Sequence, residues 1–403
     1  MRLARAAARS VRRTAVRSVK AGLGWTASPV LVRSPVVSGL WRAVLSAPGL
    51  PERARSKLTD QVQASLLRAG RPAQAVRTSG AALRRIRNRR LRTDLLIRQA
   101  TAELETGTPP TLPAAVSAEL AFADEFLGQG DVRGTVRSLQ AAQRLLFNRR
   151  LHFDRLSSPL ADDAGRFLAP WHQSAAVRAL SAPRGRGGLP GPVPTDRPLR
   201  LLLATYGNHG FLKSIREHFE QSPKVEVRFL DPGEEGGQHV PLLNNSRAMM
   251  EHILRGESTY GDRVREWLGP HVAWADVVFV DWCAALAVLF TLVDPGSTRI
   301  VVRLHSFEAF ALWPHLVDFS RVDDVIFVSD HLRDLAVEAV PGLASGGPRL
   351  HVLSNAMDLR SYRRPKNPDA RFTLAVVGIK AVAKDPGWAV RVLRHLRTYD
   401  DRY

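Results

Sequence analysis

The stretch from Ile300 to Phe310, reading IVVRLHSFEAF, constrains the fold of this chain more than any other. It opens with a run of β-branched apolar residues and places polar side chains only after Leu304. A short, fully apolar run of this kind is typical of a parallel strand buried on both faces. In open α/β sheets, ligands bind at the carboxyl ends of the strands, which is where His305 and Glu308 fall. The stretch therefore predicts an α/β fold with a candidate site at this edge.

The same alternation of apolar run and helical segment extends over residues 199–355 and predicts a Rossmann-like parallel sheet. A further apolar run, Phe372–Val377, is followed by a loop at 378–384 and a helix at 386–397, which predicts the start of a second Rossmann-like sheet. The expected strands of the first sheet are 199–205, 224–230, 276–280, 299–304, 325–328 and 350–353, and its expected helices include 211–220, 246–268 and 329–340.

The N-terminal half is predicted to be all-helical and contains an internal repeat. Residues 66–91 align with residues 126–151 at an offset of 60, with Gly70 opposite Gly130 and the run NRRL shared. The arrangement of a helix, a glycine-containing turn and a second helix with small residues resembles a tetratricopeptide (TPR) hairpin. Such a region either presents a groove to a protein partner or serves as a scaffold without a ligand of its own.

Composition shifts divide the chain into five expected parts. They are a basic segment at 1–50, a helical-repeat region at 51–180, a Pro/Gly linker at 181–198, a Rossmann-like domain at 199–362, and the incomplete start of a second one at 363–403.

The positive charge is concentrated near the N-terminus. Of the net charge of +20, residues 1–100 supply +19, from 22 Lys and Arg against three acidic residues. Residues 1–20 space their basic side chains as on one face of a helix, which predicts either an amphipathic helix on an anionic membrane surface or a disordered basic tail. Because aromatic residues and base-reading motifs are missing there, we expect no nucleic-acid partner.

Cys283 is the only cysteine, so the sequence excludes an intramolecular disulfide and a cysteine-rich zinc site. Arg33 and Arg42 interrupt the N-terminal apolar stretch, which argues against a secretory signal. The longest apolar run, 277–293, contains Asp281 and fits a core strand and helix better than a membrane span. We therefore expect a cytoplasmic protein, with a peripheral place at the inner membrane face as an option.

Five fragments, in this order and spacing, resemble the GT-B glycosyltransferases of family 4, and within them a bacterial subgroup associated with surface-polysaccharide synthesis. The resemblance covers roughly residues 199–403. The fragments that carry it read YGNHGFLKSIREHF, RLHSFEAF, VIFVSDHLRD, LHVLSNAMDLRSY and FTLAVVGIKAVAKDPGWAV. The resemblance implies two Rossmann-like domains, a nucleotide-diphosphate sugar as donor, a glycan or lipid-linked acceptor, and no cofactor or metal.

The resemblance assigns site residues one by one. His305 corresponds to the active-site His of retaining members, and Glu308 would hold the imidazole or a substrate hydroxyl. The remaining matches are to donor- or acceptor-binding positions: Gly207, Asn208 and Gly210 in the loop after the first strand, Ser329 at a helix start, Asn355 in a turn, and Gly378, Lys380 and Lys384 in the second domain.

The second domain departs from the family pattern. The family's phosphate-binding Arg position holds Ile379, and Lys380 beside it could substitute only as a point charge, since it lacks the planar fork. The family's pair of Glu residues, seven apart, would lie beyond Tyr403. The sequence thus predicts a donor domain that is incomplete, whether as a fragment or as a natural truncation.

Structural explanations compete with several of these assignments. A strand-end His can simply cap a helix, and a carboxylate such as Glu308 can stabilise a helix start. The trio Asp281-Trp282-Cys283 is interpreted as packing, with Cys283 a poor candidate for a nucleophile. The remaining histidines lack metal-ligand spacing, so no metal site is expected.

Two other functions stay open beside a retaining glycosyltransferase. One is a non-catalytic helical-repeat scaffold carrying a degenerate or truncated transferase domain. The other is a sugar-nucleotide epimerase of the GT-B fold.

Overall fold

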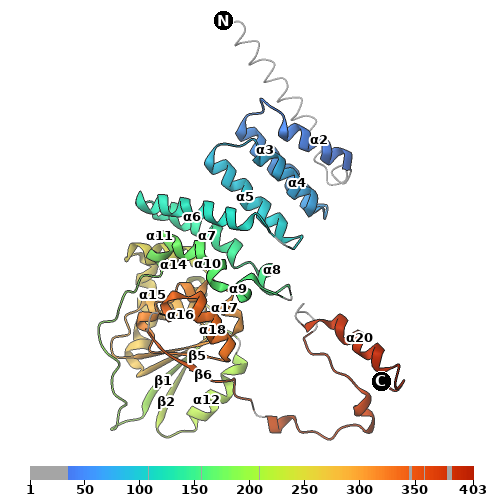
Figure 1. The fold of residues 1–403 in the computed structure, drawn as a ribbon. Coiled ribbons are helices and arrows are strands. Elements are labelled where there is room, and N and C mark those ends of the chain that lie inside the picture. Colours follow the sequence, from blue (N-terminus) through green and yellow to red (C-terminus); the bar gives the residue numbers. More distant parts are fainter. Residues whose placement is uncertain are drawn as a thin grey trace. The chain divides into compact units, whose positions relative to one another are not determined.

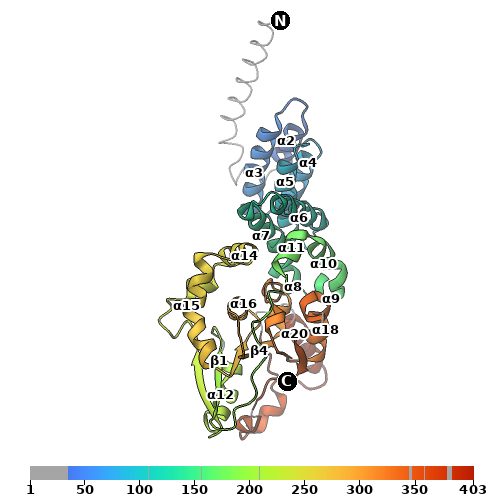
Figure 2. The same cartoon turned by 90° about the vertical axis from the view of Figure 1, so that its left-hand side faces the viewer.

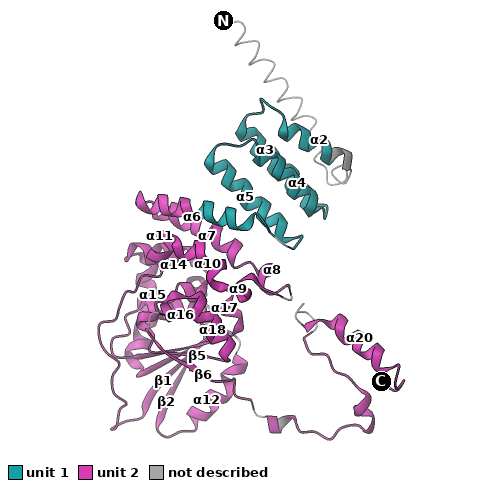
Figure 3. Cartoon of the chain, in the orientation of Figure 1, with its two compact units in different colours: residues 1–119 teal, residues 120–403 magenta. Residues whose placement is uncertain are grey.

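The computed structural model describes residues 35–107, 109–155, 157–207, 209–344, 347–357, 359–378 and 384–403, shown from two sides in Figure 1 and Figure 2. The chain divides into two compact units, residues 1–119 and residues 120–403 (Figure 3). The expected basic helix at residues 1–20 lies outside the described residues. The five expected parts of the chain stay predictions, because they follow composition rather than compactness.

The first unit is helical. Its described helices are α2 (Pro35–Ser46), α3 (Glu52–Arg68), α4 (Pro72–Leu83), α5 (Arg89–Leu104) and the start of α6 (Leu112–Gly128). Leu45, Val62 and Leu95 belong to one core cluster and are completely buried. The buried guanidinium of Arg55 donates to the carbonyl oxygens of Leu45, Ala47 and Leu50, and so closes the carboxyl end of α2.

The internal repeat has a structural counterpart in both of its copies. Gly70 ends α3 with φ of 68°, and Gly130 ends α6 with φ of 73°, a backbone conformation that favours glycine. Each copy continues with a second helix, α4 or α7 (Val132–Leu146), and then a third one, α5 or α8 (Arg149–His152). Asn88 and Asn148 cap these third helices with their side chains. The assignment to a TPR-like class remains a prediction.

The second unit is built on a parallel six-stranded sheet in the order β2-β1-β3-β4-β5-β6. Every strand predicted between residues 199 and 355 is present with its ends within two residues, and the α/β class is confirmed. The strands are β1 (Leu199–Ala204), β2 (Val225–Leu230), β3 (Val277–Asp281), β4 (Arg299–Leu304), β5 (Asp324–Phe327) and β6 (Arg349–Val352).

Helices surround this sheet in both views (Figures 1 and 2). Those that follow the strands are α12 (Lys213–Glu220), α14 (Ser246–Arg255), α15 (Thr259–Trp274), α16 (Ala285–Leu292), α17 (Ser306–Ala309) and α18 (Asp330–Ala339). A single helix over 246–268 was expected, and this was wrong. Gly256 adopts φ of 82° and ends α14, and the Ser258 hydroxyl then caps α15 by accepting the N–H of Gly261.

The stretch expected as a Pro/Gly linker, residues 181–198, is bound to the sheet part of its own unit. The Arg186 guanidinium donates to Asp323 at 2.8 Å and to the carbonyl oxygens of Gly296 and Thr298. The N–H of Arg184 donates to Asp318. These charge-assisted bonds hold the segment in place although its composition is that of a flexible linker.

The strand expected at Phe372–Val377 is wrong. Residues 373–378 have no regular structure, and Val377 is 82% exposed. A β-strand needs a neighbour to satisfy its backbone groups, and none of the described residues pairs with this one. The expected helix is present as α20 (Pro386–Leu396), with no buried residue.

Candidate functional site

The strand order locates a switch point between β1 and β3. β2 lies on one side of β1, and β3 and the later strands lie on the other side. At such a point the connections leave in opposite directions, and in open α/β sheets ligands bind beside the carboxyl ends of the strands there. Asp281 ends β3 at this edge, and His305 directly follows the neighbouring strand β4.

A buried cluster joins these two strand ends. Asp281 is the register partner of Arg303 across β3 and β4, and His305 lies two residues further along, on the same face. Oδ1 of Asp281 accepts from Arg303 Nε at 2.6 Å and from His305 Nε2 at 2.9 Å. None of the three residues is more than 5% exposed. We call Asp281, Arg303 and His305 the carboxyl-edge cluster.

The charges of this cluster fix its proton positions. Burial by itself would raise the pKa of Asp281, but the hydrogen bonds from His305 and Arg303 outweigh burial and hold that pKa below its usual value. An ionised Asp281 can only accept, so Nε2 of His305 carries the proton. In the neutral ring, Nδ1 is then the acceptor. The ring also faces the backbone N–H of Glu308 in a capping box at the start of α17, which is the structural role that competes with a site role.

Aromatic rings cover the imidazole. Trp282 stacks on His305 with ring centroids 4.0 Å apart and an interplanar angle of 25°, and Phe211 lies 5.1 Å from the same ring. Trp282 reaches this position with φ of 72°, a conformation that is rare for a bulky residue and costs free energy. Arg303 also donates to the carbonyl oxygen of Phe211 at 3.2 Å, which ties the loop after β1 to the cluster.

Glu308 is the third residue of α17 and is completely buried. Its Oε1 accepts the backbone N–H of His305 at 3.2 Å and that of Cys283 at 3.0 Å. Burial raises the pKa of Glu308 to about 8, against the backbone hydrogen bonds that lower it. The side chain is therefore a neutral acid at pH 7. Glu308 thus stabilises the helix start and bonds the backbone of His305 rather than its imidazole. Its contact with a substrate hydroxyl stays a prediction.

Three buried polar atoms around the cluster have no hydrogen-bond partner among the described residues. They are Oδ2 of Asp281, Oε2 of Glu308 and Nε1 of Trp282. An unpaired buried polar atom costs about 1–3 kcal/mol. Their grouping at one strand edge indicates a place where a polar ligand or water would bond.

The glycine loop after β1 is held by a second acid. Gly207 adopts φ of 65°, and its N–H donates to Oδ2 of Asp231 at 3.0 Å. His209 Nε2 lies 2.9 Å from the same oxygen. Gly210 lies in a 3-10 turn (η2, His209–Phe211), with open space where a Cβ would be. Asn208 lies outside the described residues.

Ser329 and Asn355 follow β5 and β6 at the same edge of the sheet. Ser329 occupies the position before α18, but its side chain makes no capping bond and contacts His331 at 3.5 Å. Asn355 is half-buried, with a buried Oδ1 that has no partner in the described chain. No described hydrogen bond joins either residue to the carboxyl-edge cluster.

Of the second-domain candidates, Gly378 and Lys384 are described and Lys380 is not. Gly378 adopts φ of 84°, and the Lys384 side chain lies against it, 3.4 Å from where a Cβ would be. Lys384 is exposed.

Sequence reasoning missed the partners of His305. Asp281 and Trp282 were interpreted as packing at a strand end, whereas the carboxylate binds His305 and the indole stacks on it. A signal was present, because a charged Arg303 inside an apolar strand requires a buried counter-ion. Cys283 is fully buried, and burial raises its pKa well above the usual value, which suppresses the nucleophilic thiolate.

The opposite edge of the sheet holds a cavity of about 520 Å³ lined by residues that precede β3 and β4. Its charges are already paired, with Arg197 donating to Asp276 at 2.6 Å and 2.8 Å. Within the described part of the chain, no three His, Cys, Asp or Glu side chains gather as a metal site would require. The expectation of a metal-free site stays a prediction. The described helices include none with the length and apolarity that a membrane span needs.

Comparison with known proteins gives little. No family model matches the sequence, and no curated protein matches it. Four chains of solved structures match, among them a point mutant of the O-GlcNAc transferase of Thermobaculum terrenum. That likeness has 13% sequence identity and a TM-score of 0.25, and it covers 79% of this chain but 57%, less than two thirds, of the other. A likeness this distant carries no argument about fold or activity, so both rest on the residues themselves.

Proposed function

We propose that this chain is a GT-B glycosyltransferase similar to family 4. It would move a sugar from a nucleotide-diphosphate donor to a hydroxyl of a glycan, lipid or cell-surface polymer, with retention. The observation that supports this most is the carboxyl-edge cluster, in which a carboxylate orients a histidine beside a switch point and keeps one oxygen unpaired. The order of the sequence fragments that resemble the family supplies the reaction class.

His305 would bond the reacting sugar hydroxyl through Nδ1, in exchange for the Glu308 backbone N–H that faces the ring in the capping box. Asp281 keeps the proton on Nε2 and holds the ring in one orientation, which is the arrangement that makes a histidine an effective proton acceptor. Phe211 is 37% exposed and follows the glycine loop, so a substrate that displaces this ring gains access to the imidazole. A positioned base of this kind contributes about 10²–10⁴ in rate.

The unpaired atoms suit a ligand rich in hydroxyl groups. Oδ2 of Asp281 would accept a hydroxyl proton, and Nε1 of Trp282 would donate to a hydroxyl oxygen. Glu308, being protonated at pH 7, would donate from Oε2 while Oε1 keeps its two backbone bonds. Aromatic faces beside such polar groups are usual in small-molecule sites.

The donor would be held mainly by loop amides and two lysine side chains. We propose that the residues of the glycine loop, with Ser329 and Asn355, contact donor or acceptor, and that Gly378, Lys380 and Lys384 hold the diphosphate without a metal. Positive charge placed on a departing diphosphate stabilises the transition state. Anionic lipid at the inner membrane face would attract residues 1–50, and the helical repeat would offer a surface to a protein partner.

The test measures sugar transfer by the full chain from a panel of nucleotide-diphosphate sugars, with thermal shifts to find the donor. His305→Ala should reduce transfer about 10²–10⁴-fold. His351→Ala is the matched control, because His351 also bonds an aspartate, Asp324, but belongs to β6, two strands away from β4. It should leave transfer unchanged.

Transfer by His305→Ala at the wild-type rate would contradict the role of His305. A folded wild-type protein that neither binds nor consumes any donor would contradict the enzyme and favour the scaffold. Release of an altered free sugar without transfer would favour the epimerase.

A further inference from the structure

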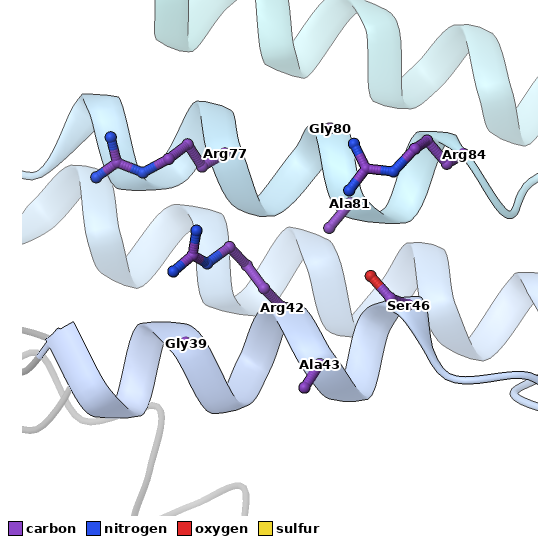
Figure 4. A pocket seen from close by; sticks show the side chains of 8 residues that line it. All are labelled: Gly39, Arg42, Ala43, Ser46, Arg77, Gly80, Ala81 and Arg84. Atoms are coloured by element: carbon purple, nitrogen blue, oxygen red, sulfur yellow. The ribbon is translucent and has the colours of Figure 1, made fainter.

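A groove lined by arginines lies between α2 and α4 in the first unit (Figure 4). Its volume is about 420 Å³, within the range of small-ligand sites. The eight residues that line it are Gly39, Arg42, Ala43, Ser46, Arg77, Gly80, Ala81 and Arg84. We call it the arginine groove.

The groove exists because small residues face it from both helices. Gly39 and Ala43 belong to α2, and Gly80 and Ala81 belong to α4. Larger side chains would fill the space between the two packed helices, whereas these four small residues leave it open. Small residues alone would mean only close helix packing, so the charge of the groove decides its meaning.

Three guanidinium groups line the groove without a counter-ion. Arg42 extends from α2 toward α4, and Arg77 and Arg84 come from α4 itself (Figure 4). No carboxylate is among the lining residues, and none of the three arginines has a hydrogen-bond or ion-pair partner in the described part of the chain. Other arginines of this unit do find partners, as Arg90 does with Glu119 at 2.8 Å. Like charges that line one groove repel one another, and an anion between them reduces the repulsion.

We propose that the arginine groove binds a phosphate group carried by a lipid head group or by a soluble phosphate ester. Guanidinium forks match phosphate oxygens in geometry and form paired, charge-assisted bonds with them. The Ser46 hydroxyl adds a further donor at one end of the groove. The exposed Leu40 beside Gly39, with 59% of its surface accessible, would meet acyl chains if the phosphate belongs to a lipid.

This proposal stands apart from the glycosyltransferase one. The arginine groove uses residues 39–84 in the first unit, whereas the carboxyl-edge cluster belongs to the second. Either function can fail without the other.

The test uses the full chain and two kinds of probe. Titration calorimetry with inorganic phosphate and pyrophosphate reports a soluble source. Co-sedimentation with phosphatidylcholine vesicles, with or without phosphatidic acid, reports a lipid source. The triple change Arg42→Gln, Arg77→Gln and Arg84→Gln should weaken binding of the active probe at least about tenfold, because several charge-assisted bonds are lost.

Three matched variants distinguish specific binding in the arginine groove from attraction by the overall positive charge of the protein. Arg53→Gln, Arg71→Gln and Arg85→Gln together remove the same charge from exposed positions of this unit outside the groove, and should weaken binding less than about twofold at physiological salt. Lysine at the three groove positions keeps the charge but loses the forks, and should still weaken binding. Ser46→Leu should block one end of the groove without changing charge.

The outcomes are decisive in both directions. Binding of pyrophosphate or of phosphatidic acid vesicles that only the groove variants weaken supports the proposal and names the source. Binding of neither probe overturns it. Equal losses in the groove triple and in the control triple, or full binding by the lysine triple and by Ser46→Leu, overturn it as well, since bulk charge would then suffice.

Discussion

The sheet holds two aspartates that are each bound by arginine and histidine, and the two clusters differ in what they leave unpaired. Asp281 ends β3 at the carboxyl edge, and Asp324 begins β5, a position that we call the amino edge. At the amino edge, Asp324 accepts from Arg349 through both oxygens at 2.9 Å, from His351 at 2.8 Å and from Arg299 at 3.3 Å. At the carboxyl edge, Asp281 uses Oδ1 alone, and Oδ2 has no described partner. The amino-edge cluster is thus complete as it stands.

Burial separates the two clusters further. The side chains of Arg349 and His351 are 64% and 44% exposed, whereas those of Arg303 and His305 are 5% exposed. An exposed, fully paired cluster ties two strand ends together at small electrostatic gain. A buried cluster with an empty acceptor bears the cost of desolvation without full compensation, which proteins tolerate at functional sites. The same residue types therefore have different meanings at the two edges.

The largest expected effect comes from neutralising each aspartate. Asp281→Asn would leave Arg303 buried without a counter-charge, and should lower the free energy of unfolding by about 3 kcal/mol or more. Asp324→Asn should lower it by about 1 kcal/mol, because water screens the exposed partners. Urea unfolding of the full chain at pH 7, followed by circular dichroism, measures both values. Equal losses would break the distinction between the two edges.

The pH dependence of stability should also have opposite signs at the two edges. The pKa of Glu308, at about 8, lies above its usual value of 4.5, so the unfolded chain ionises first as the pH rises. Its contribution to stability is therefore lost between pH 4.5 and 8, by at most about 1.4 kcal/mol per pH unit. Glu308→Gln keeps an acceptor for the two backbone N–H groups and removes the titration. The variant should gain stability relative to the wild type over this interval.

For Asp324 the sign reverses. Burial opposes its ionisation, but the bonds from Arg349, His351 and Arg299 outweigh burial and hold its pKa below the usual value. Its contribution is present above the usual aspartate pKa and is lost as the pH falls through the lowered one. Unfolding curves from pH 2 to 8 compare Glu308→Gln and Asp324→Asn with the wild type, since the Asp324 contribution is lost only below the usual aspartate pKa of 3.8. If the stability difference between Glu308→Gln and the wild type does not change with pH, then Glu308 is not a neutral acid in the folded chain.

The two clusters also show how much of the fold and of the candidate site could be predicted from the sequence. Apolar runs located the strands of the sheet, and for the inner strands the reason is that a strand buried on both faces has few alternatives in composition. The edge strands β2 and β6 are only partly buried and were found by short runs that include polar residues. His305 and Glu308 were identified as candidates, since both follow such a run. Asp281 was not, because its bond to His305 depends on β3 lying beside β4 in one register, which no local pattern encodes. Pairing between segments 22 residues or more apart is a property of the topology.

Predictions from local sequence patterns were also wrong where a single residue determines the backbone conformation. The sequence pattern predicted one helix over 246–268, but the left-handed backbone at Gly256 ends α14. The run Phe372–Val377 has the composition of a strand, but no described strand pairs with it. The arginine groove likewise depends on two helices, so the sequence revealed its charge and not its shape.

The smallest effect concerns one glycine at each edge. Gly207, after β1, and Gly296, before β4, both adopt positive φ, 65° and 53°, and both have open space where a Cβ would lie. Alanine at either position should therefore cost only the backbone term, about 1 kcal/mol in the free energy of unfolding. If the carboxyl edge holds the sugars, Gly207→Ala should in addition slow transfer by shifting the loop that carries Phe211, while Gly296→Ala should not. Transfer rates measured at equal folded fraction test this, and an equal slowing by both variants would mean that lost stability, rather than the place of the loop, limits the reaction.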